Sequence, residues 1–340
     1  MKTQRQSLSR RTLVKATLGG LSAMPLFDSA LADSTHWQTQ SPLPIQVQEL
    51  YPTVHEGKLY VAGGIAARLG VPYFTNRSFC YDPKRNQWDE TAELPVDLHH
   101  VALVSAPLTS ASPQLYALGG FNGGYSHIWR MRDKIYQLQE DTWQPVATLP
   151  KPLAEGVIAA HNNNVHIVTG QSPKGLNNTD RSDHTEVADH YIWDGQNFTT
   201  AAPIPTVRNS ATGGWVNGHL VVAGGRTAAG NLNTTEVYDP KLDKWHNARP
   251  MPKPQAGTAS VVVGDELWVF GGEIFQPKAY VFANCWRYNF NADQWQSLPD
   301  MLTPRHGLGA GKIGNTIYVI GGATEPGGRG TSGLNESISI

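Results

Sequence analysis

The chain has 340 residues, of which 27 are basic and 28 acidic, and its formal net charge at pH 7 is −1. No run of like charge occurs along it. Because nucleic-acid binding requires a clustered basic face, this distribution excludes nucleic acid as the expected partner.

Residues 1–32 have the pattern of an export signal that is removed from the mature protein. Ser9–Lys15 reads SRRTLVK, which resembles the twin-arginine motif, and a modest apolar run leads to a small-residue cleavage site at Ala30–Ala32. A disordered basic tail or a membrane anchor is the alternative, but the apolar run contains Ser22 and Pro25 and is shorter than the roughly 20 residues that a spanning helix needs. We therefore expect the folded protein to be exported across a prokaryotic inner membrane and to be periplasmic or secreted.

Cleavage there removes five cations and one anion. The mature chain, residues 33–340, then has 22 basic and 27 acidic side chains and a net charge of −5. We expect no transmembrane segment in it.

The region 208–252 shows most clearly how the mature chain is organised. The β-branched run Leu220–Ala223 ends at Gly224-Gly225, and a polar loop leads to a strand-like alternating segment. Asp239-Pro240 predicts a turn, and Trp245 lies in a last strand. This pattern predicts four short antiparallel strands in 45 residues, with no helical period.

Two markers repeat along the chain with a common period of 47 to 56 residues. The double glycines, or a threonine-glycine substitute, are Gly63-Gly64, Gly119-Gly120, Thr169-Gly170, Gly224-Gly225, Gly271-Gly272 and Gly321-Gly322. The large aromatic residues are Trp37, Trp88, Trp143, Phe198, Trp245 and Trp295. Six copies of each marker indicate six repeats of one structural unit.

This period, with Gly-Gly, Tyr-Asp-Pro and Trp in fixed order, resembles the kelch repeat, which forms one blade of a β-propeller. Tyr81-Asp82-Pro83 and Tyr238-Asp239-Pro240 carry the complete turn, whereas the third repeat is degenerate at Thr169 and Phe198. The resemblance implies an all-β fold, a six-bladed kelch β-propeller formed by residues 33–340 as one domain. Since Trp37 precedes the first double glycine, we expect an N-terminal strand to complete the C-terminal blade and close the ring.

The residues expected at the starts of the six inner strands surround one mouth of the central channel, and the loops after the double glycines flank the same mouth. Rigid scaffolds often carry function on such loops. We expect a polar pocket for a hydroxylated or anionic ligand, in which arginine matches a carboxylate with two parallel hydrogen bonds. A capping role for Arg208 and Arg305 is the structural alternative. The candidate pocket residues are Glu49, His100, Glu155, Arg208, Asn209, Arg226, Glu273, Arg305 and His306.

Other chemical motifs give no functional prediction. Gly309–Gly314 matches GxGxxG but lies in a predicted strand and turn, whereas a dinucleotide site needs a following helix. The acidic segment from Asp180 to His190 matches no calcium loop, and we predict no metal or cofactor. Cys80 and Cys285 belong to blades one and five, too far apart for a disulfide, so we expect two free, mostly buried thiols.

Two enzyme families share the predicted architecture. Galactose oxidase resembles it in its kelch blades, but its copper site needs a set of ligands that this chain lacks. The exported bacterial sialic acid mutarotases are similar in size and have a glutamate directly after a double glycine, which Glu273 matches. Their arginine a few residues later has no counterpart here, where Ala279 follows Lys278.

We therefore expect a binding module that works through the channel mouth, and we expect a monomer. Its partner is a sugar, an acidic small molecule or an envelope protein. The alternative is an isomerase similar to the mutarotases, which uses glutamate, histidine and arginine at the same mouth.

Overall fold

The computed structural model describes residues 36–122 and 129–340, and the predicted export signal lies outside them. Within these residues no helix is both long enough and apolar enough to cross a membrane. Apart from a 3-10 turn, η1 (Arg181–Asp183), the regular structure in these ranges consists of strands.

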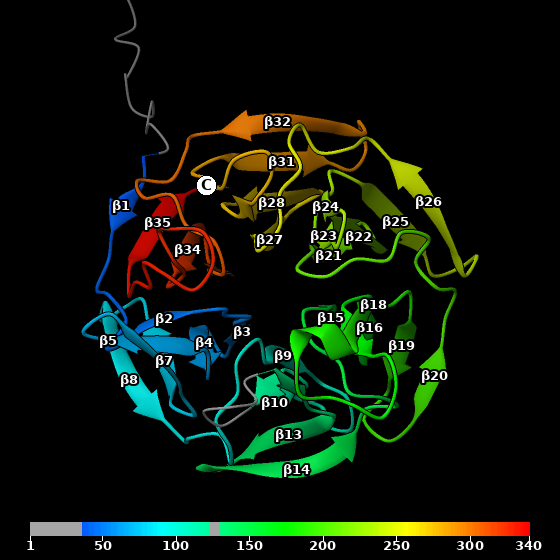
Figure 1. Ribbon diagram of the computed structural model, residues 1–340, viewed down its shortest axis with the longest axis horizontal. Coiled ribbons are helices and arrows are strands. Elements are labelled where there is room, and N and C mark those ends of the chain that lie inside the picture. Colours follow the sequence, from blue (N-terminus) through cyan, green and yellow to red (C-terminus); the bar gives the residue numbers. More distant parts are fainter. Residues whose placement is uncertain (1–35, 123–128) are drawn as a thin grey trace, which may run out of the picture. The chain divides into compact units, whose positions relative to one another are not determined.

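The described part of the chain forms six four-stranded antiparallel sheets arranged in a ring (Figure 1). Blades one to three are β3 (Thr53–His55), β4 (Lys58–Ala62), β7 (Ser78–Asp82) and β8 (Gln87–Thr91); β9 (Ala102–Ala106), β10 (Gln114–Leu118), β13 (Lys134–Gln139) and β14 (Thr142–Thr148); and β15 (Val157–His161), β16 (Asn164–Val168), β19 (His190–Trp193) and β20 (Phe198–Thr200). Blades four to six are β21 (Thr212–Val216), β22 (His219–Ala223), β25 (Thr235–Asp239) and β26 (Lys244–Ala248); β27 (Ala259–Val263), β28 (Glu266–Phe270), β31 (Cys285–Asn289) and β32 (Gln294–Leu298); and β33 (Gly309–Ile313), β34 (Thr316–Ile320), β35 (Asn335–Ser339) and β1 (Gln38–Thr39). The six predicted blades are confirmed.

The first strand of the fold closes the ring. Gln38 of β1 pairs with Ser337 of β35, so the sixth blade is built from both ends of the described chain. The inner strands β3, β9, β15, β21, β27 and β33 contact one another in succession, and β33 also contacts β3. The predicted closure is confirmed.

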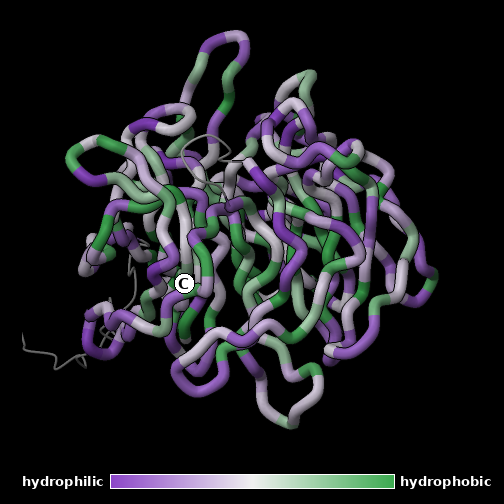
Figure 2. The backbone as a smooth tube through the Cα atoms, turned by 60° about the horizontal axis from the view of Figure 1, so that its bottom comes forward, coloured by the Kyte–Doolittle hydropathy of each residue, from purple (hydrophilic) through white to green (hydrophobic). Residues whose placement is uncertain are grey.

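Apolar and polar side chains alternate along the strands, and the apolar ones form the core between blades. In Figure 2 the hydrophobic stretches follow the strands, whereas the turns at their ends are mostly hydrophilic. At the closing joint, for example, Trp37 packs edge-on against Phe270 with ring centroids 5.9 Å apart, in one cluster with Leu308 and Val319. Burial of this apolar surface between neighbouring sheets holds each blade to the next.

The repeated tryptophans also hold one blade to the next through polar bonds. Trp88 donates its indole N–H to the carbonyl oxygen of Ser41, whose own N–H donates to the side chain of Asn86 in the turn before Trp88. Both the backbone carbonyl and the backbone N–H of Ser41, in the preceding connection, are therefore hydrogen-bonded to blade one. The same pair of bonds joins Trp245 and Asp243 to Ala202, and Trp295 and Asp293 to Arg249.

The double glycines connect adjacent blades at the other end of the strands. Gly64 donates its backbone N–H to the carbonyl oxygen of Leu98 in the next blade at 2.7 Å. A Cβ on Gly63 would lie 2.2 Å from that oxygen, so the approach requires glycine. The equivalent bonds run from Gly120 to Leu153, Gly170 to Arg208, Gly225 to Gln255, Gly272 to Arg305 and Gly322 to Val47. This bond occurs in all six blades and fixes the residues that follow the acceptor.

Short ribbons continue past the double glycines on this face of the ring. They are β5 (Ile65–Arg68) with β6 (Val71–Phe74) and β2 (Gln46–Gln48), β11 (Phe121–Asn122) with β12 (Arg130–Met131), β17 (Gln171–Pro173) with β18 (His184–Glu186), β23 (Arg226–Thr227) with β24 (Gly230–Asn231), and β29 (Glu273–Ile274) with β30 (Tyr280–Val281). The ribbons surround the end of the channel that we call the mouth.

The two cysteines lie in strands of different blades. Cys80 in β7 and Cys285 in β31 are buried and free.

Candidate functional site

Six equivalent residues encircle the channel at the mouth, one from each blade. Each adopts a left-handed backbone conformation, with φ between 51° and 64°: Glu49, His100, Glu155, Ser210, Gly257 and Gly307. The inner strands were predicted to start at or just before these residues, but they begin two residues after them in five blades and four residues after Glu49 in blade one. Backbone bonds run from Glu49 N–H to Gly307, from Gly307 to Gly257, from Gly257 to Ser210 and from Ser210 to Glu155, at 2.7 to 3.0 Å. A left-handed conformation is costly for a residue such as glutamate, and these bonds help to hold Glu49 and Glu155 in place.

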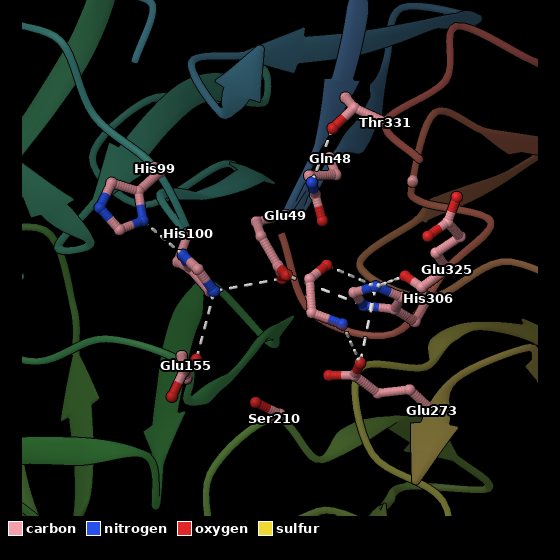
Figure 3. Close-up of polar contacts among 12 residues, drawn as sticks. Gln48, Glu49, His99, His100, Glu155, Ser210, Glu273, His306, Glu325 and Thr331 are labelled. Atoms are coloured by element: carbon pink, nitrogen blue, oxygen red, sulfur yellow. Dashed lines mark hydrogen bonds and ion pairs between the residues drawn. The ribbon is translucent and has the colours of Figure 1, made fainter. Parts of the chain in front are cut away.

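The two halves of this ring differ in the charge and size of their side chains. Blades one to three contribute Glu49, His100 and Glu155, whereas blades four to six contribute serine and two glycines. The small residues leave room for side chains from neighbouring positions, namely Arg226, Glu273 and His306 (Figure 3 shows the last two). Sequence reasoning proposed all six of these charged or titratable residues, and the structure brings them together.

His100 lies between two carboxylates. Its Nε2 is 3.1 Å from Glu49 Oε2 and 3.2 Å from Glu155 Oε1, and all three side chains are largely buried (Figure 3). Burial alone would lower the pKa of His100, but the two carboxylates outweigh it and raise the pKa to about 9. Burial likewise opposes ionisation of both glutamates, yet His100 holds the pKa of each below its ordinary value. The three groups are therefore charged together at neutral pH.

The protonation of His100 also fixes the hydrogen on its neighbour. His99 Nδ1 lies 2.7 Å from His100 Nδ1. Because a protonated imidazole donates from both nitrogens, His99 accepts at Nδ1 and carries its own hydrogen on Nε2. His99 is in turn stacked between Phe74 and Phe121, at centroid distances of 4.8 and 5.2 Å. This aromatic stack orients the His100 ring.

A second charged group faces the first across the mouth. Glu273 Oε1 binds Arg226 Nη1 at 2.7 Å, and Glu273 Oε2 accepts the backbone N–H of Gly327 at 2.9 Å. His306 Nε2 is 3.5 Å from the same oxygen and 3.0 Å from two carbonyl oxygens, so it carries a hydrogen. His306 Nδ1 lies 3.9 Å from Glu49 Oε1. Glu49 therefore connects both groups.

Four of these six side chains line a cavity of about 220 Å³, whereas Glu155 and His306 lie behind them as their partners. Phe74, Trp129 and Phe275 form aromatic parts of its wall, and Glu49, His100, Arg226 and Glu273 form the charged part; Gln48, Ile65, Pro72, Arg181, Gly327 and Gly328 complete it. Gln48 donates to Thr331 at 2.7 Å, and its buried Oε1 has no hydrogen-bond partner within the described residues. The cavity thus combines aromatic faces with donors and acceptors.

Arg208 and Arg305 correct the predicted pocket, because neither lines the cavity. Both are fully buried inside their own blades, where Arg208 pairs with Glu236 and Arg305 with Glu336. The Arg305 guanidinium also donates to the carbonyl oxygens of Gly321 and Leu334. Their positions precede the left-handed ring residue by two, and their side chains point into the blade. Both arginines therefore have a structural role, although through contacts inside their own blades and not as bridges between blades.

Asn209 lies at the edge of the site. Its Oδ1 is 3.3 Å from Arg226 Nε, and its Nδ2 donates to Glu186 at 2.9 Å. Asn209 therefore positions Arg226 and does not itself line the cavity.

The acidic segment of blade three stabilises its own loop. Asp183 Oδ2 accepts the backbone N–H groups of Thr179 and Asp180, both at 3.0 Å. Among the residues that the structure describes, no group of three or more His, Cys, Asp or Glu side chains is placed to hold a metal ion. The GxGxxG match lies in the propeller strand β33 and its turn.

Sequence reasoning did not include Phe74, Arg181 and Phe275 in the site. Phe74 lies on the ribbon of blade one, Arg181 starts η1, and Phe275 follows β29. All three belong to segments that follow a double glycine or its Thr169-Gly170 substitute. This place in the repeat was the sequence signal that could have indicated that they lie at the mouth. Their side-chain directions depend on loop conformations that differ from blade to blade.

Fold and site together define a six-bladed β-propeller with a polar, aromatic-walled cavity at one mouth. A family model described as "KLHDC2/KLHL20/DRC7 Kelch-repeats domain" matches residues 108–322, more than half of the chain, and a model described as "Kelch motif" matches residues 52–95. The chain belongs to the kelch-repeat family.

Similar proteins occur in a fungus and in a mammal. The chain is 25% identical over 250 residues to Kelch-like protein terF of Aspergillus terreus, an alignment that covers 70% of this chain and 52% of that protein. It is 22% identical over 255 residues to Kelch-like protein 35 of Mus musculus, which covers 74% of this chain and 40% of that protein. The chain therefore spans about half of these relatives or less.

The buried arginines give a prediction about stability. Arg305→Met leaves the Glu336 carboxylate buried and unpaired, so we expect it to lower the free energy of unfolding by about 3–5 kcal/mol. Arg305→Met combined with Glu336→Met removes both charges, and we expect it to recover more than half of that loss. Urea denaturation followed by tryptophan fluorescence measures both. Unchanged stability in the single variant would contradict the structural role.

Proposed function

We propose that this kelch propeller is a binding protein whose ligand enters the mouth cavity, and that the ligand is a small hydroxylated or acidic molecule such as a sugar acid. The observation that carries the proposal is the buried, ionised group of Glu49, His100 and Glu155, of which Glu49 and His100 line an aromatic-walled cavity. Buried ion pairs contribute little net stability compared with apolar side chains of the same size. A binding role gives a reason for their place beside an open cavity.

The chemistry of the lining supports a polyhydroxylated ligand. The Glu49 side chain is 13% exposed and the Arg226 side chain 14%, whereas their partners His100 and Glu273 are each 2% exposed, and both Glu49 and Arg226 line the cavity. A hydroxyl group both donates and accepts, which suits this mixture. The flat faces of Phe74, Trp129 and Phe275 provide apolar contact for the ring of a sugar.

An envelope protein that docks on the same mouth is the other form of the binding hypothesis. Leu69 and Leu176, at the tips of two mouth loops, are fully exposed, at 96% and 105% relative accessibility. Exposed apolar side chains around a polar centre are the usual composition of a protein-binding rim. In either form, we propose that the protein acts as a monomer.

A carbohydrate isomerase similar to the sialic acid mutarotases is the second candidate function. Glu49 lies within reach of two histidines, 3.1 Å from His100 and 3.9 Å from His306, an arrangement that suits proton transfer to and from an anomeric hydroxyl. Exchange NMR with sialic acid measures the rate of anomer interconversion. A rate equal to that of buffer alone would exclude this candidate for that sugar.

We also propose twin-arginine export of the folded protein, on the motif at Arg10-Arg11. Fractionation of cells that express the full chain tests it. Export that persists after Arg10→Lys and Arg11→Lys together would contradict the route.

Ligand binding is tested by thermal unfolding of the protein with sialic acid, galacturonic acid and neutral hexoses. A ligand at 100 times its Kd stabilises the folded state by about 2.7 kcal/mol, which raises Tm by a few degrees. Glu49→Gln should remove the shift, because it takes away the accessible carboxylate. Glu90→Gln is the matched control, since Glu90 lies on the surface paired with Arg77. No shift with any sugar, or an equal shift in Glu49→Gln, would contradict the proposal.

A further inference from the structure

A second cavity of about 430 Å³ lies next to the mouth cavity. Arg181, Arg226 and Phe275 line both cavities. The remaining wall of the second comes from blades three and four: Gln171, Lys174, His184, Thr185, Glu186, Asn209, Thr227 and Ala228. The two cavities are therefore neighbours that share one boundary.

The mouth cavity is small for a site that encloses a whole ligand. Pockets that bury most of a drug-sized ligand have volumes of about 300–1,000 Å³. The mouth cavity falls below this range, at about 220 Å³, whereas its neighbour falls within it, at about 430 Å³. A ligand that enters the mouth cavity and is longer than one ring would extend into the second.

The shared boundary carries two guanidinium groups with donors to spare. Arg226 uses Nη1 on Glu273 and Nε on Asn209, so two of its five N–H groups are engaged in these bonds. Arg181 lies 4.3 Å above the Trp129 ring, and among the described residues its guanidinium has no ion pair. Arginine matches a carboxylate or a sulfate through parallel bonds. The boundary is therefore suited to an anionic group.

The charges around the second cavity also favour an anionic ligand. Lys174, Arg181 and Arg226 line it, whereas Glu186 is its one carboxylate among the described lining residues. Glu186 Oε1 already accepts from Asn209 at 2.9 Å. In the first cavity, by contrast, Glu49 and Glu273 pair with His100 and Arg226, and Arg181 at the boundary is the cation left over. Negative charge on a ligand is thus favoured at the boundary and beyond it.

We propose that the two cavities are subsites of one binding site, and that its ligand is an acidic oligosaccharide of at least two rings whose acidic group is bound between Arg181 and Arg226. One ring contacts the Glu49 side of the mouth, and the next lies over blades three and four. This proposal rests on the proposed function, since it assumes that the mouth binds a sugar.

Isothermal titration calorimetry with galacturonic acid and with its oligomers of two and three units tests the proposal. We expect the trimer to bind at least about tenfold more tightly than the monomer. Arg181→Gln should weaken trimer binding about tenfold, as expected for the loss of a charged hydrogen bond. Arg329→Gln is the matched control: Arg329 is an exposed arginine on a mouth loop of blade six and lines neither cavity.

The outcomes separate this proposal from the one on which it rests. Monomer and trimer binding with equal affinity would overturn the two-subsite proposal and leave the sugar-binding function standing. An Arg181→Gln variant that binds the trimer as the wild type does, or that resembles Arg329→Gln, would also overturn it. If no sugar binds, both proposals are wrong.

Discussion

The structure depends on one hydrogen bond that is repeated in every blade. The second residue of each double glycine donates its N–H to a carbonyl oxygen of the next blade, at 2.7 to 3.0 Å. At Gly63 that approach leaves only 2.2 Å between an added Cβ and the acceptor, and in every blade the bond fixes the acceptor two residues before the left-handed ring position. The mouth residues are therefore held by the same contact that joins the blades. In blade three Thr169 replaces the first glycine at φ 54°, and its hydroxyl adds a bond to the same acceptor, Arg208.

A nearly sixfold backbone thus carries side chains that are far from sixfold. At the ring position, three blades supply Glu49, His100 and Glu155, and the other three supply serine or glycine. Placing these charges in a buried position costs desolvation energy, which ion pairing offsets only with good geometry. Here each carboxylate has a cationic partner within 3.2 Å. The rigid ring holds that geometry, and the small residues opposite leave the cavity open.

Much of this organisation follows from sequence alone. The period of the double glycines predicts the blade count, and the position of Trp37 predicts the closing strand. Because every blade places the same position at the mouth, the sequence also predicts that Glu49, His100, Glu155 and Glu273 converge. The repeat marks the positions of the tryptophans, but their hydrogen bonds to the preceding connection could be found only from the structure.

The limits of sequence reasoning are equally physical. Alternation along a strand predicts which side chains share a face, but the left-handed residue interrupts it just before each inner strand. Arg208 and Arg305 therefore point to Glu236 and Glu336 inside their blades, while residues next to them reach the mouth. Arg181 lies in a loop whose 3-10 turn, η1, has no counterpart among the described residues of the other blades. Its place at the boundary of the two cavities had no periodic signal.

The central claim is that the mouth holds an ionised, buried group poised for a ligand. The most direct test is an NMR titration of the His100 imidazole between pH 5 and 10. Its folded pKa of about 9 lies above the ordinary 6.5, so the account predicts an imidazolium that stays protonated through neutral pH and loses its proton only near pH 9. A pKa at or below 6.5 would mean that burial prevails over the two carboxylates, and it would contradict the account.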